Sequence, residues 1–380
     1  MPWKVRDAMT LKREFVELGV RENANLADLC RRYKISRKTG YKWLRRYMRE
    51  GMEGLKEKSR RPLNSPWHSQ ESTEKLVAEV RRDHPAWGAR KIEVEMGKRV
   101  KEYGFQGIHI PATSTIHEIL KRKGFIEPET AAQRRAHIRF ERQEPNELWQ
   151  MDFKGHFAIK QGRCHPLTVL DDHSRFSLGL KACKDEGVQT VQEGLTELFR
   201  RYGLPLWILC DNGAPWGSDK EHPHTILTVW LMKLGIQVTH GRPYHPQTQG
   251  KDERFHRTLK AEVLSRYQFE DHLDCQKRFD EWREVYNHRR PHEALGMMVP
   301  ANRYRVSSLV FPEKVAEPQY DGLTVRRVDG AGIIYWLGRE WRLGKPFVGQ
   351  SVALRPTNED GKYEVIFYSH VIKELDIRVN

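Results

Sequence analysis

The chain has 380 residues, too many for one small domain, and its 38% hydrophobic content is enough to build cores, which excludes an intrinsically disordered chain. Its charge is strongly basic, with 66 Lys and Arg against 51 Asp and Glu, a net charge of +15. This sign favours a polyanionic partner, first nucleic acid and second an anionic membrane surface. Residues 1–61 hold 18 Lys and Arg against eight Asp and Glu, so the charge is concentrated there. Solubility alone is the plainer interpretation of that charge.

The five cysteines indicate the redox compartment. Their number is odd and none forms a Cys-x-x-Cys pair, so we expect a reducing compartment and no disulfide framework. No apolar run approaches the roughly 18 residues that span a bilayer. The first 15 residues are charged throughout and lack a signal-peptide core. We therefore expect a cytoplasmic protein with access to DNA and no membrane partner.

The first predicted domain, residues 1–62, has the pattern of a helix-turn-helix. Leu26, Leu29 and Tyr33 lie at helical spacing, on a helix that begins near residue 25. After a short break, Ser36 is a plausible N-cap for a second helix over residues 37–48. Its predicted buried residues are Tyr41 and Leu44, with Met48 as a further candidate. The second helix of this motif enters the major groove of DNA, whereas an ordinary helical hairpin is the alternative. The predicted DNA-contacting residues on its exposed side are Arg37, Lys38, Lys42, Arg45 and Arg46.

Residues 63–144 form a second predicted unit with linkers. The basic, proline-punctuated stretch 59–66 fits a spacer or a segment lying along a minor groove. Three helices are predicted over residues 71–82, 89–101 and 114–123, an arrangement compatible with a second helix-turn-helix. Residues 127–145 are polar and basic, and we expect a connector there.

From about residue 145 the pattern changes to short apolar runs separated by helical segments. Strands are predicted over residues 148–159, 165–170, 177–182 and 207–210, and helices over 188–202, 227–234, 251–267 and 273–287. This alternation predicts an α/β core with a mixed sheet over residues 145–305. Residues 306–380 alternate in short segments interrupted by Gly and charged residues, which predicts a small β-barrel or sandwich.

Three carboxylates from separate core segments are candidates for a metal site. Asp152 lies on the first predicted strand, Asp211 directly follows the strand 207–210, and Glu253 lies near the start of the helix 251–267. Each has a plainer interpretation: a surface strand residue, an Asp-Asn-Gly turn and a charge on a solvated helix. Three carboxylates brought together without a cation would repel one another. Mg²⁺ prefers oxygen ligands, and two such ions activate the attacking oxygen and stabilise the leaving one.

The segments around these carboxylates carry a family resemblance. The runs WQMD at 149–152, LCDNG at 209–213 and HPQTQGKDERFHRTLK at 245–260 resemble, in this order, the signatures of the integrase catalytic core. Retroviral integrases and many bacterial insertion-sequence transposases share that core. The runs VLDDHSR at 169–175 and YNHRRPHEAL at 286–295 resemble its flanking blocks, and the helix-turn-helix front resembles the bacterial transposases.

This resemblance covers roughly residues 145–305. It implies a ribonuclease-H-like fold and an Asp-Asp-Glu triad that corresponds to Asp152, Asp211 and Glu253. It also implies Mg²⁺ or Mn²⁺ as cofactor, with two ions expected, and a bacterial, nucleoid-associated protein.

Two departures from the family pattern stand out. Between Asp211 and Glu253 lie 41 residues, more than the family usually has, and we assign the excess to a loop over residues 216–224. Retroviral integrases carry an N-terminal His-His-Cys-Cys zinc site. The first 61 residues here hold one Cys and no His, so no zinc is expected.

The register of the third carboxylate has two solutions, because Asp252 and Glu253 are adjacent and about 100° apart around a helix. Phe255, Leu259 and Val263 define the predicted buried stripe. Glu253 shares a neighbouring face with His256, Arg257 and Lys260, and the family's Glu-Arg-Phe pattern favours it as the ligand. The residues expected to position phosphates are Lys251, Arg254, Arg257 and Lys260.

Four further polar residues near these segments are interpreted as structural or packing residues. Asp171 and Asp172 are expected to cap the turn before the next strand. His245 and His256 are expected to pack or to face substrate rather than to bind metal.

The predicted reaction is phosphoryl transfer on double-stranded DNA. Metal-activated water cuts the strand at an element end, and the freed 3′-hydroxyl attacks a target phosphodiester, with no covalent protein–DNA bond. The family's logic implies a homo-multimer that joins two terminal repeats to target DNA, and the β domain could bridge to DNA or to another subunit. Two alternatives stay open: a DNA-binding regulator with an inactive core, and a ribonuclease-H-type nuclease acting on RNA–DNA hybrid.

Overall fold

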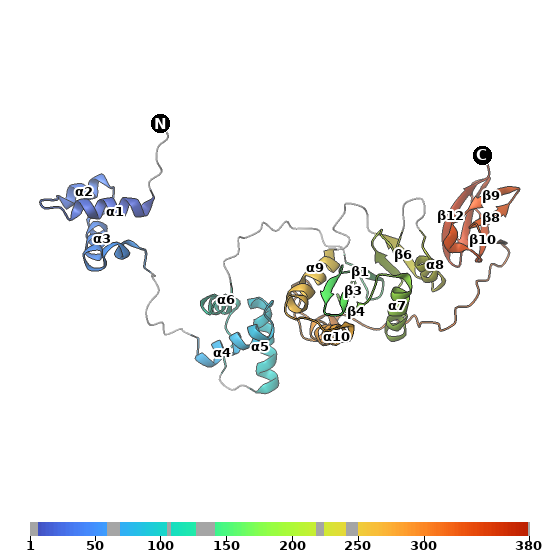
Figure 1. The fold of residues 1–380 in the computed structure, drawn as a ribbon, viewed down its shortest axis with the longest axis horizontal. Helices are drawn as coiled ribbons and strands as arrows, with labels where there is room; N and C mark the ends of the chain where they lie inside the picture. Colours follow the sequence, from blue (N-terminus) through green and yellow to red (C-terminus); the bar gives the residue numbers. More distant parts are fainter. Residues whose placement is uncertain are drawn as a thin grey trace. The chain divides into compact units, whose positions relative to one another are not determined.

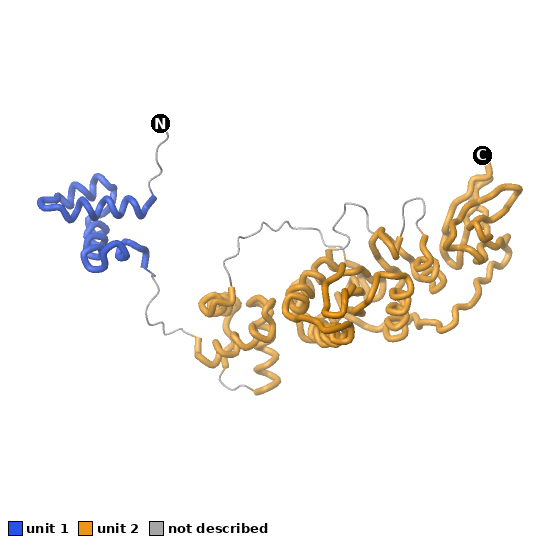
Figure 2. The backbone as a smooth tube through the Cα atoms, in the orientation of Figure 1, with its two compact units in different colours: residues 1–68 blue, residues 69–380 orange. Residues whose placement is uncertain are grey.

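The computed structural model describes residues 7–58, 69–104, 108–126, 141–217, 224–240 and 250–378 (Figure 1). The chain divides into two compact units, residues 1–68 and residues 69–380 (Figure 2). Within the described ranges, no helix combines the length and the apolar character that crossing a bilayer requires.

The first unit is helical, with α1 (Ala8–Gly19), α2 (Leu26–Arg32), α3 (Arg37–Glu50) and the short 3-10 turn η1 (Gly51–Leu55). The predicted cap is confirmed, because the Ser36 hydroxyl accepts a hydrogen bond of 3.1 Å from the Thr39 amide. Helix α1 was not predicted from the sequence, and it supplies the buried residues Phe15 and Val16. These helices give the expected helix-turn-helix arrangement, with α3 as the second helix.

The predicted buried face of α3 was partly wrong. Leu44 is buried, but Tyr41 is 47% exposed and Met48 is 66% exposed. Trp43 occupies the core instead, together with Phe15 of α1. Helix α1 decides which side of α3 is buried, because it packs on the side of α3 that carries Gly40, Trp43 and Leu44.

Gly40 is the point of closest approach in this unit. A Cβ atom there would lie 2.5 Å from the Cys30 sulfur and 2.9 Å from the Phe15 ring. Real Cβ atoms do not approach other atoms so closely, so the packing of α3 depends on glycine at this position.

The second unit begins with three helices, α4 (Glu71–Asp83), α5 (Ala89–Tyr103) and α6 (Thr113–Arg122). Their bounds lie close to the predicted ones. The helices enclose a core that includes Trp87, Ile92, Met96 and Ile116, each 0% exposed. The helical spacing of Ile92, Met96 and Val100 predicts a buried stripe on α5, of which Ile92 and Met96 are fully buried and Val100 is partly buried.

A mixed sheet follows, as predicted, in the strand order β2-β3-β1-β5-β6, with β4 pairing with β3. Strand β1 is antiparallel to β3 and parallel to β5, and β5 is parallel to β6. The predicted strand over 148–159 is interrupted at Gly155, whose φ of +80° breaks the extended backbone. Strand β6 was not predicted from the sequence. The strands are β1 (Leu148–Phe153), β2 (Phe157–Ile159), β3 (Gly162–Asp171), β4 (Ser177–Cys183), β5 (Trp207–Cys210) and β6 (Gln237–His240).

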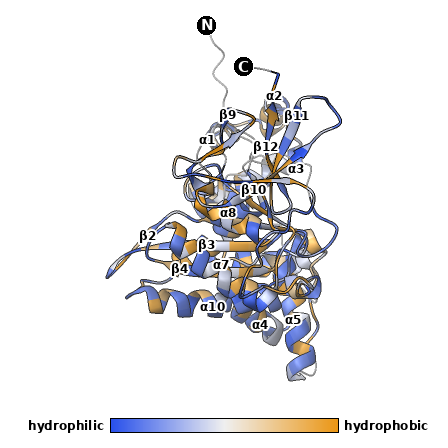
Figure 3. Ribbon diagram, turned by 90° about the vertical axis from the view of Figure 1, so that its right-hand side faces the viewer, coloured by the Kyte–Doolittle hydropathy of each residue, from blue (hydrophilic) through white to orange (hydrophobic). Residues whose placement is uncertain are grey.

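Helices build separate cores on the two faces of this sheet. Leu195 and Phe199 of α7 pack in one core with Trp149 of β1. Phe255 of α9 and Phe279 of α10 pack in the other core with strand residues of β3 and β4. Figure 3 shows α10 as mainly hydrophilic with hydrophobic residues at intervals, the pattern of a helix that buries one face. The helices are α7 (Val188–Tyr202), α8 (Ile226–Lys233), α9 (Gly250–Leu259), the π-helical turn η2 (Lys260–Leu264), α10 (His272–His288), and the short turns η3 (Glu293–Leu295) and η4 (Pro300–Asn302).

The last segment forms antiparallel sheets, but a closed barrel is not confirmed. Four strands pair in the order β12-β11-β10-β7, and β8 pairs with β9 in a separate two-stranded sheet. The described strands do not close on themselves, so two small sheets cover one core that includes Phe347, Val352 and Phe367. The elements are β7 (Thr324–Arg327), β8 (Ile333–Trp336), β9 (Arg339–Arg342), η5 (Lys345–Phe347), β10 (Ser351–Pro356), β11 (Lys362–Phe367) and β12 (His370–Asp376).

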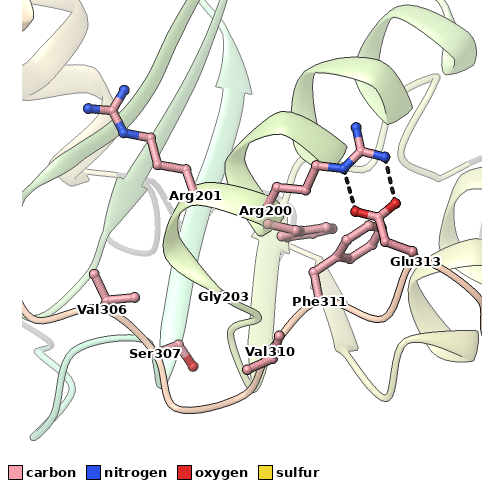
Figure 4. Close-up of a pocket in the computed structure, with 9 residues that line it drawn as sticks. Arg200, Arg201, Gly203, Val306, Ser307, Val310, Phe311 and Glu313 are labelled. Atoms are coloured by element: carbon pink, nitrogen blue, oxygen red, sulfur yellow. Dashed lines mark hydrogen bonds and ion pairs between the residues drawn. The ribbon is translucent and has the colours of Figure 1, made fainter.

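An open pocket of about 450 Å³ lies where α7 ends against the segment 306–313 (Figure 4). The guanidinium of Arg200 donates two hydrogen bonds of 2.7 Å to the carboxylate of Glu313, and both residues line the pocket. Gly203 ends α7 with φ +75°, and a Cβ there would lie 2.6 Å from the Leu309 carbonyl oxygen. None of the residues predicted to act in catalysis or DNA binding lines this pocket.

Candidate active site

Two of the candidate carboxylates are set side by side by parallel strand pairing. Trp149 of β1 pairs with Ile208 of β5, and Gln150 pairs with Leu209. Continuing this register by two residues sets Asp152 beside Asp211. Burial raises the pKa of Asp152 to about 6, and the negative charge of Asp211 adds to the increase. The two carboxylates therefore interact electrostatically at one end of the parallel strands, where open α/β sheets place ligands.

Asp211 also belongs to a turn, as its Asp-Asn-Gly sequence suggested. Its side chain accepts a hydrogen bond of 2.7 Å from the Asn212 amide. Its main-chain oxygen lies 3.0 Å from His240 Nδ1, on the neighbouring strand β6. The carboxylate is exposed. The turn interpretation and the ligand interpretation are thus compatible, because the turn holds an accessible carboxylate at the strand end.

The third candidate segment is helix α9. The predicted buried stripe is confirmed, with Phe255 and Val263 each 1% exposed and Leu259 0% exposed. Glu253 is exposed on this helix. Its neighbour Asp252 is only 1% exposed, and the charge of Asp152 acts on it. The structure therefore brings Asp252, rather than Glu253, into the buried space beside Asp152.

A second buried carboxylate nearby, Asp172, has a full set of partners. It accepts hydrogen bonds from the Gln150 side chain at 2.6 Å and the Arg142 amide at 2.7 Å, and its Oδ1 lies 2.6 Å from Lys251 Nζ. Asp171 likewise accepts from the amides of Ser174 at 2.8 Å and Asn146 at 2.7 Å. Both residues therefore have the structural role expected of them.

His256 is buried, whereas Glu253, Arg257 and Lys260, which were predicted to share its face, are exposed. The Thr168 hydroxyl donates to the Asp152 main-chain oxygen at 2.9 Å, so it accepts from His256 Nε2 at 2.9 Å. The other ring nitrogen, Nδ1, lies 3.9 Å from Asp152 Oδ2. Burial lowers the pKa of His256 to about 4, with the charge of Lys154 as a smaller cause. The residue is thus a neutral neighbour of Asp152, in keeping with the expectation that it packs rather than binds metal.

The expected phosphate-positioning residues of α9 fall into two groups. Arg254, Arg257 and Lys260 are exposed. Lys251 is largely buried, and its ammonium contacts both the side chain of Asp172 and its main-chain oxygen, the latter at 2.8 Å. A structural role accounts for that ammonium without any phosphate.

The predicted DNA-reading residues of α3 are divided in a similar way. Arg37, Lys38, Lys42 and Arg45 are exposed. Arg46 is half-buried, and its guanidinium lies 5.2 Å from the Trp43 ring centroid. Four of the five predicted basic residues thus form an exposed face of α3, and the exposed side chain of Tyr41 lies among them.

The three proposed ligands are only partly assembled. Among the described residues, no group of three or more His, Cys, Asp and Glu side chains is placed to hold one metal ion. His245 and much of the loop assigned to the long spacing, residues 218–223, lie outside the described residues, as does 241–249.

The sequence analysis missed the environment of Asp252, although a signal for it was present. Asp252, Phe255 and Leu259 follow one another at spacings of three and four, so Asp252 extends the buried stripe by one turn. The family's Glu-Arg-Phe pattern had favoured Glu253 over Asp252 as the ligand.

Family comparison places this geometry among known proteins. The family described as integrase core domain matches residues 142–246 and again 234–300. A helix-turn-helix domain matches residues 11–62, a homeodomain-like domain matches residues 39–120, and the C-terminal domain of IS481 family transposases matches residues 323–380. Models of helix-turn-helix domains, of the integrase core domain and of a transposase C-terminal domain thus match successive parts of the chain. The expected resemblance to insertion-sequence transposases is confirmed.

Individual relatives agree with this assignment. The chain is 28% identical over 159 residues to an uncharacterised protein of insertion element IS476 from Xanthomonas euvesicatoria, covering 41% of this chain and 44% of that protein. It is 24% identical over 234 residues to the transposase InsD of insertion element IS2 from Escherichia coli, covering 58% of this chain and 74% of InsD. The match therefore spans less than half of the first relative. The HTLV-2 integrase catalytic core in complex with magnesium aligns over 43% of this chain and 99% of that chain, with 18% identity and a TM-score of 0.34.

Proposed function

We propose that this chain is a DNA transposase that cuts DNA at the ends of a mobile element and joins the freed ends to target DNA. The observation that carries the proposal is that the register of the adjacent parallel strands β1 and β5, when continued, sets Asp152 beside Asp211, whose charge acts on Asp152, in a segment that matches the integrase core domain. The relatives from insertion elements support the same function.

The residues present fit a divalent cation. The donors at the strand ends are carboxylate oxygens, which Mg²⁺ and Mn²⁺ prefer. Asp252 adds two buried carboxylate oxygens that have no hydrogen-bond partner, as suits oxygens that bind a cation. Asp152, Asp211 and Glu253 would hold the metal, with two ions expected, and zinc has no role in this proposal. When bound, the metal would activate the attacking oxygen and offset charge on the leaving oxygen.

The chain's own groups would orient DNA for this reaction. The exposed side chains of Arg254 and Arg257 lie on α9 with Glu253, exposed Lys260 begins the adjoining turn η2, and the three would supply positive charge for phosphates. The exposed basic face of α3 would choose the element ends by entering the major groove. A homo-multimer would hold two ends together with double-stranded target DNA.

The domain division that goes with this function follows the predicted boundaries. Residues 1–62 and 63–144 would bind DNA, residues 145–305 would carry out the chemistry, and residues 306–380 would contact DNA or another subunit. The site of action would be the bacterial cytoplasm, at the nucleoid.

The test uses the full chain with labelled duplexes that carry the terminal repeats flanking its gene. With Mg²⁺ we expect both shortened strands and products joined to a second duplex, and with EDTA we expect neither. Cleavage of RNA–DNA hybrid without joining would support the ribonuclease alternative. Specific binding without any cleavage in Mg²⁺ or Mn²⁺ would support the regulator alternative.

A further inference from the structure

Asp252 is a buried carboxylate without a partner. It lies in the first turn of α9, which contacts β1, and it is 1% exposed. Neither Oδ1 nor Oδ2 has a hydrogen-bond partner. A buried charge in this state is strongly unfavourable unless something compensates it.

The surrounding charges make the position of Asp252 worse. The negative charges of Asp152 and Asp172 act on it, and Lys251 supplies a positive charge. The ammonium of Lys251 is already bound to Asp172 at 2.6 Å. The N-terminal end of α9 offers a partial positive charge, which is small beside two neighbouring carboxylates.

The contrast with Asp172 shows what is missing. Asp172 is equally buried but receives an ammonium, a side-chain amide and a main-chain amide. Asp252 has none of these partners, and the carboxylate that acts on it is that of Asp152 on β1, the strand that α9 contacts. One helical turn further along α9, His256 Nδ1 lies 3.9 Å from Asp152 Oδ2, so this side of the helix is turned to Asp152. Carboxylates from neighbouring elements are the ligands that a hard cation prefers.

We propose that Asp252 is a fourth carboxylate of the metal centre, supplying a further oxygen ligand to the divalent cation held at Asp152. This inference rests on the proposed function. Adjacent helix residues point about 100° apart, so one turn of α9 offers buried Asp252 toward β1 and exposed Glu253 toward solvent. Asp252 and Asp152 therefore hold the cation before DNA arrives, and Glu253 completes the site.

Mn²⁺ binding to the DNA-free full chain tests this proposal, measured by loss of the free Mn²⁺ signal in electron paramagnetic resonance. Asp252→Asn keeps the shape of the side chain, and Asp252→Val replaces it with an apolar group that matches the stripe of α9. Asp152→Asn removes a carboxylate of the proposed metal centre, so the Mn²⁺ binding that this variant loses is the binding at that centre. Asp280→Asn, at an exposed position of α10, is the matched control for loss of one carboxylate. Circular dichroism melting of each metal-free variant reports folding.

We expect both Asp252 variants to bind Mn²⁺ about tenfold or more weakly, with Asp280→Asn unchanged. We also expect metal-free Asp252→Val to melt no lower than the wild type, because it removes a buried carboxyl group that has no hydrogen-bond partner. If Asp152→Asn abolishes Mn²⁺ binding while both Asp252 variants bind as the wild type does, the inference is wrong and the proposed function stands. If the wild type binds no Mn²⁺ at all, both are wrong.

Discussion

The imidazole of His256 lies with Nδ1 3.9 Å from Oδ2 of Asp152, while its Nε2 contacts the hydroxyl of Thr168 at 2.9 Å. Burial favours the uncharged form of both residues, so it raises the pKa of the acid and lowers the pKa of the base. It raises the pKa of Asp152 to about 6 and lowers the pKa of His256 to about 4. Both residues are therefore uncharged between these values, and each contributes to stability with its own dependence on pH.

For Asp152, the folded-state pKa is above the unfolded value, so its contribution to stability is present below pH 3.8 and is lost as the pH rises to about 6. For His256, the folded-state pKa is below the unfolded value, so its contribution is present above pH 6.5 and is lost as the pH falls to about 4. Metal-free urea unfolding across this range should therefore give opposite trends. The stability difference between the wild type and Asp152→Asn should fall with rising pH by on the order of 2 kcal/mol. The difference between the wild type and His256→Gln should fall by a similar amount with falling pH. Parallel trends would contradict the assignment.

Breaking the pair between Lys251 and Asp172 should destabilise the core. Their side chains are 10% and 0% exposed, so Lys251→Met leaves a buried carboxylate without its cation. We expect a loss of roughly 3 kcal/mol in the free energy of unfolding. Arg257→Gln, at an exposed position of the same helix, should leave stability unchanged and weaken DNA binding. If Lys251→Met instead weakened DNA binding with normal stability, Lys251 would be the phosphate contact that its sequence position suggested.

Replacing Gly40 should loosen the first unit. A Cβ atom there would collide with Cys30 and Phe15, so Gly40→Ala should shift α3 and reduce stability by about 1–3 kcal/mol. Specific DNA binding should weaken with it, as an electrophoretic shift assay would show. Gly88→Ala, where a Cβ meets nothing within 4 Å, is the control and should bind DNA normally. Unchanged melting of Gly40→Ala would show that α3 does not pack as described.

The exposed basic face of α3 should account for part of the salt dependence of DNA binding. Each phosphate contact contributes about 0.9 to the slope of log affinity against log salt concentration. Arg45→Gln should therefore lower the slope by about 0.9 if Arg45 contacts a phosphate. Arg46→Gln should lower it less, because Arg46 is half-buried against Trp43. A slope that neither substitution changes would place the DNA on another surface.

Local patterns predicted much of this fold. The periodicity at Phe255, Leu259 and Val263 correctly gave the buried face of α9, and Ser36 correctly marked the start of α3. The face of α3 was misjudged because Trp43 and Tyr41 are both aromatic, and only the packing of α1 decides which one is buried. Strand β6 was missed because its residues are only partly buried and show little apolar alternation.

At the site, the sequence pointed to Asp152 and Asp211 because Asp152 lies on a recognisable apolar strand and Asp211 directly follows another. The buried stripe of α9 already indicated that Asp252 is buried, but the sequence could not show that Asp152 is its neighbour, since that depends on which face of α9 meets β1. It also could not show that Lys251 is engaged by Asp172, a contact between residues 79 positions apart.

The proposed function requires Asp152, Asp211 and Glu253 together for the metal-dependent joining of DNA ends. The most direct measurement is the yield of joined product from a pre-cut, labelled element end and a target duplex, in Mg²⁺, at saturating protein. Asp152→Asn, Asp211→Asn and Glu253→Gln should each reduce joining at least about a hundredfold while retaining DNA binding. Exposed Asp280→Asn should join as the wild type does. Normal joining by Glu253→Gln would contradict the triad as assigned.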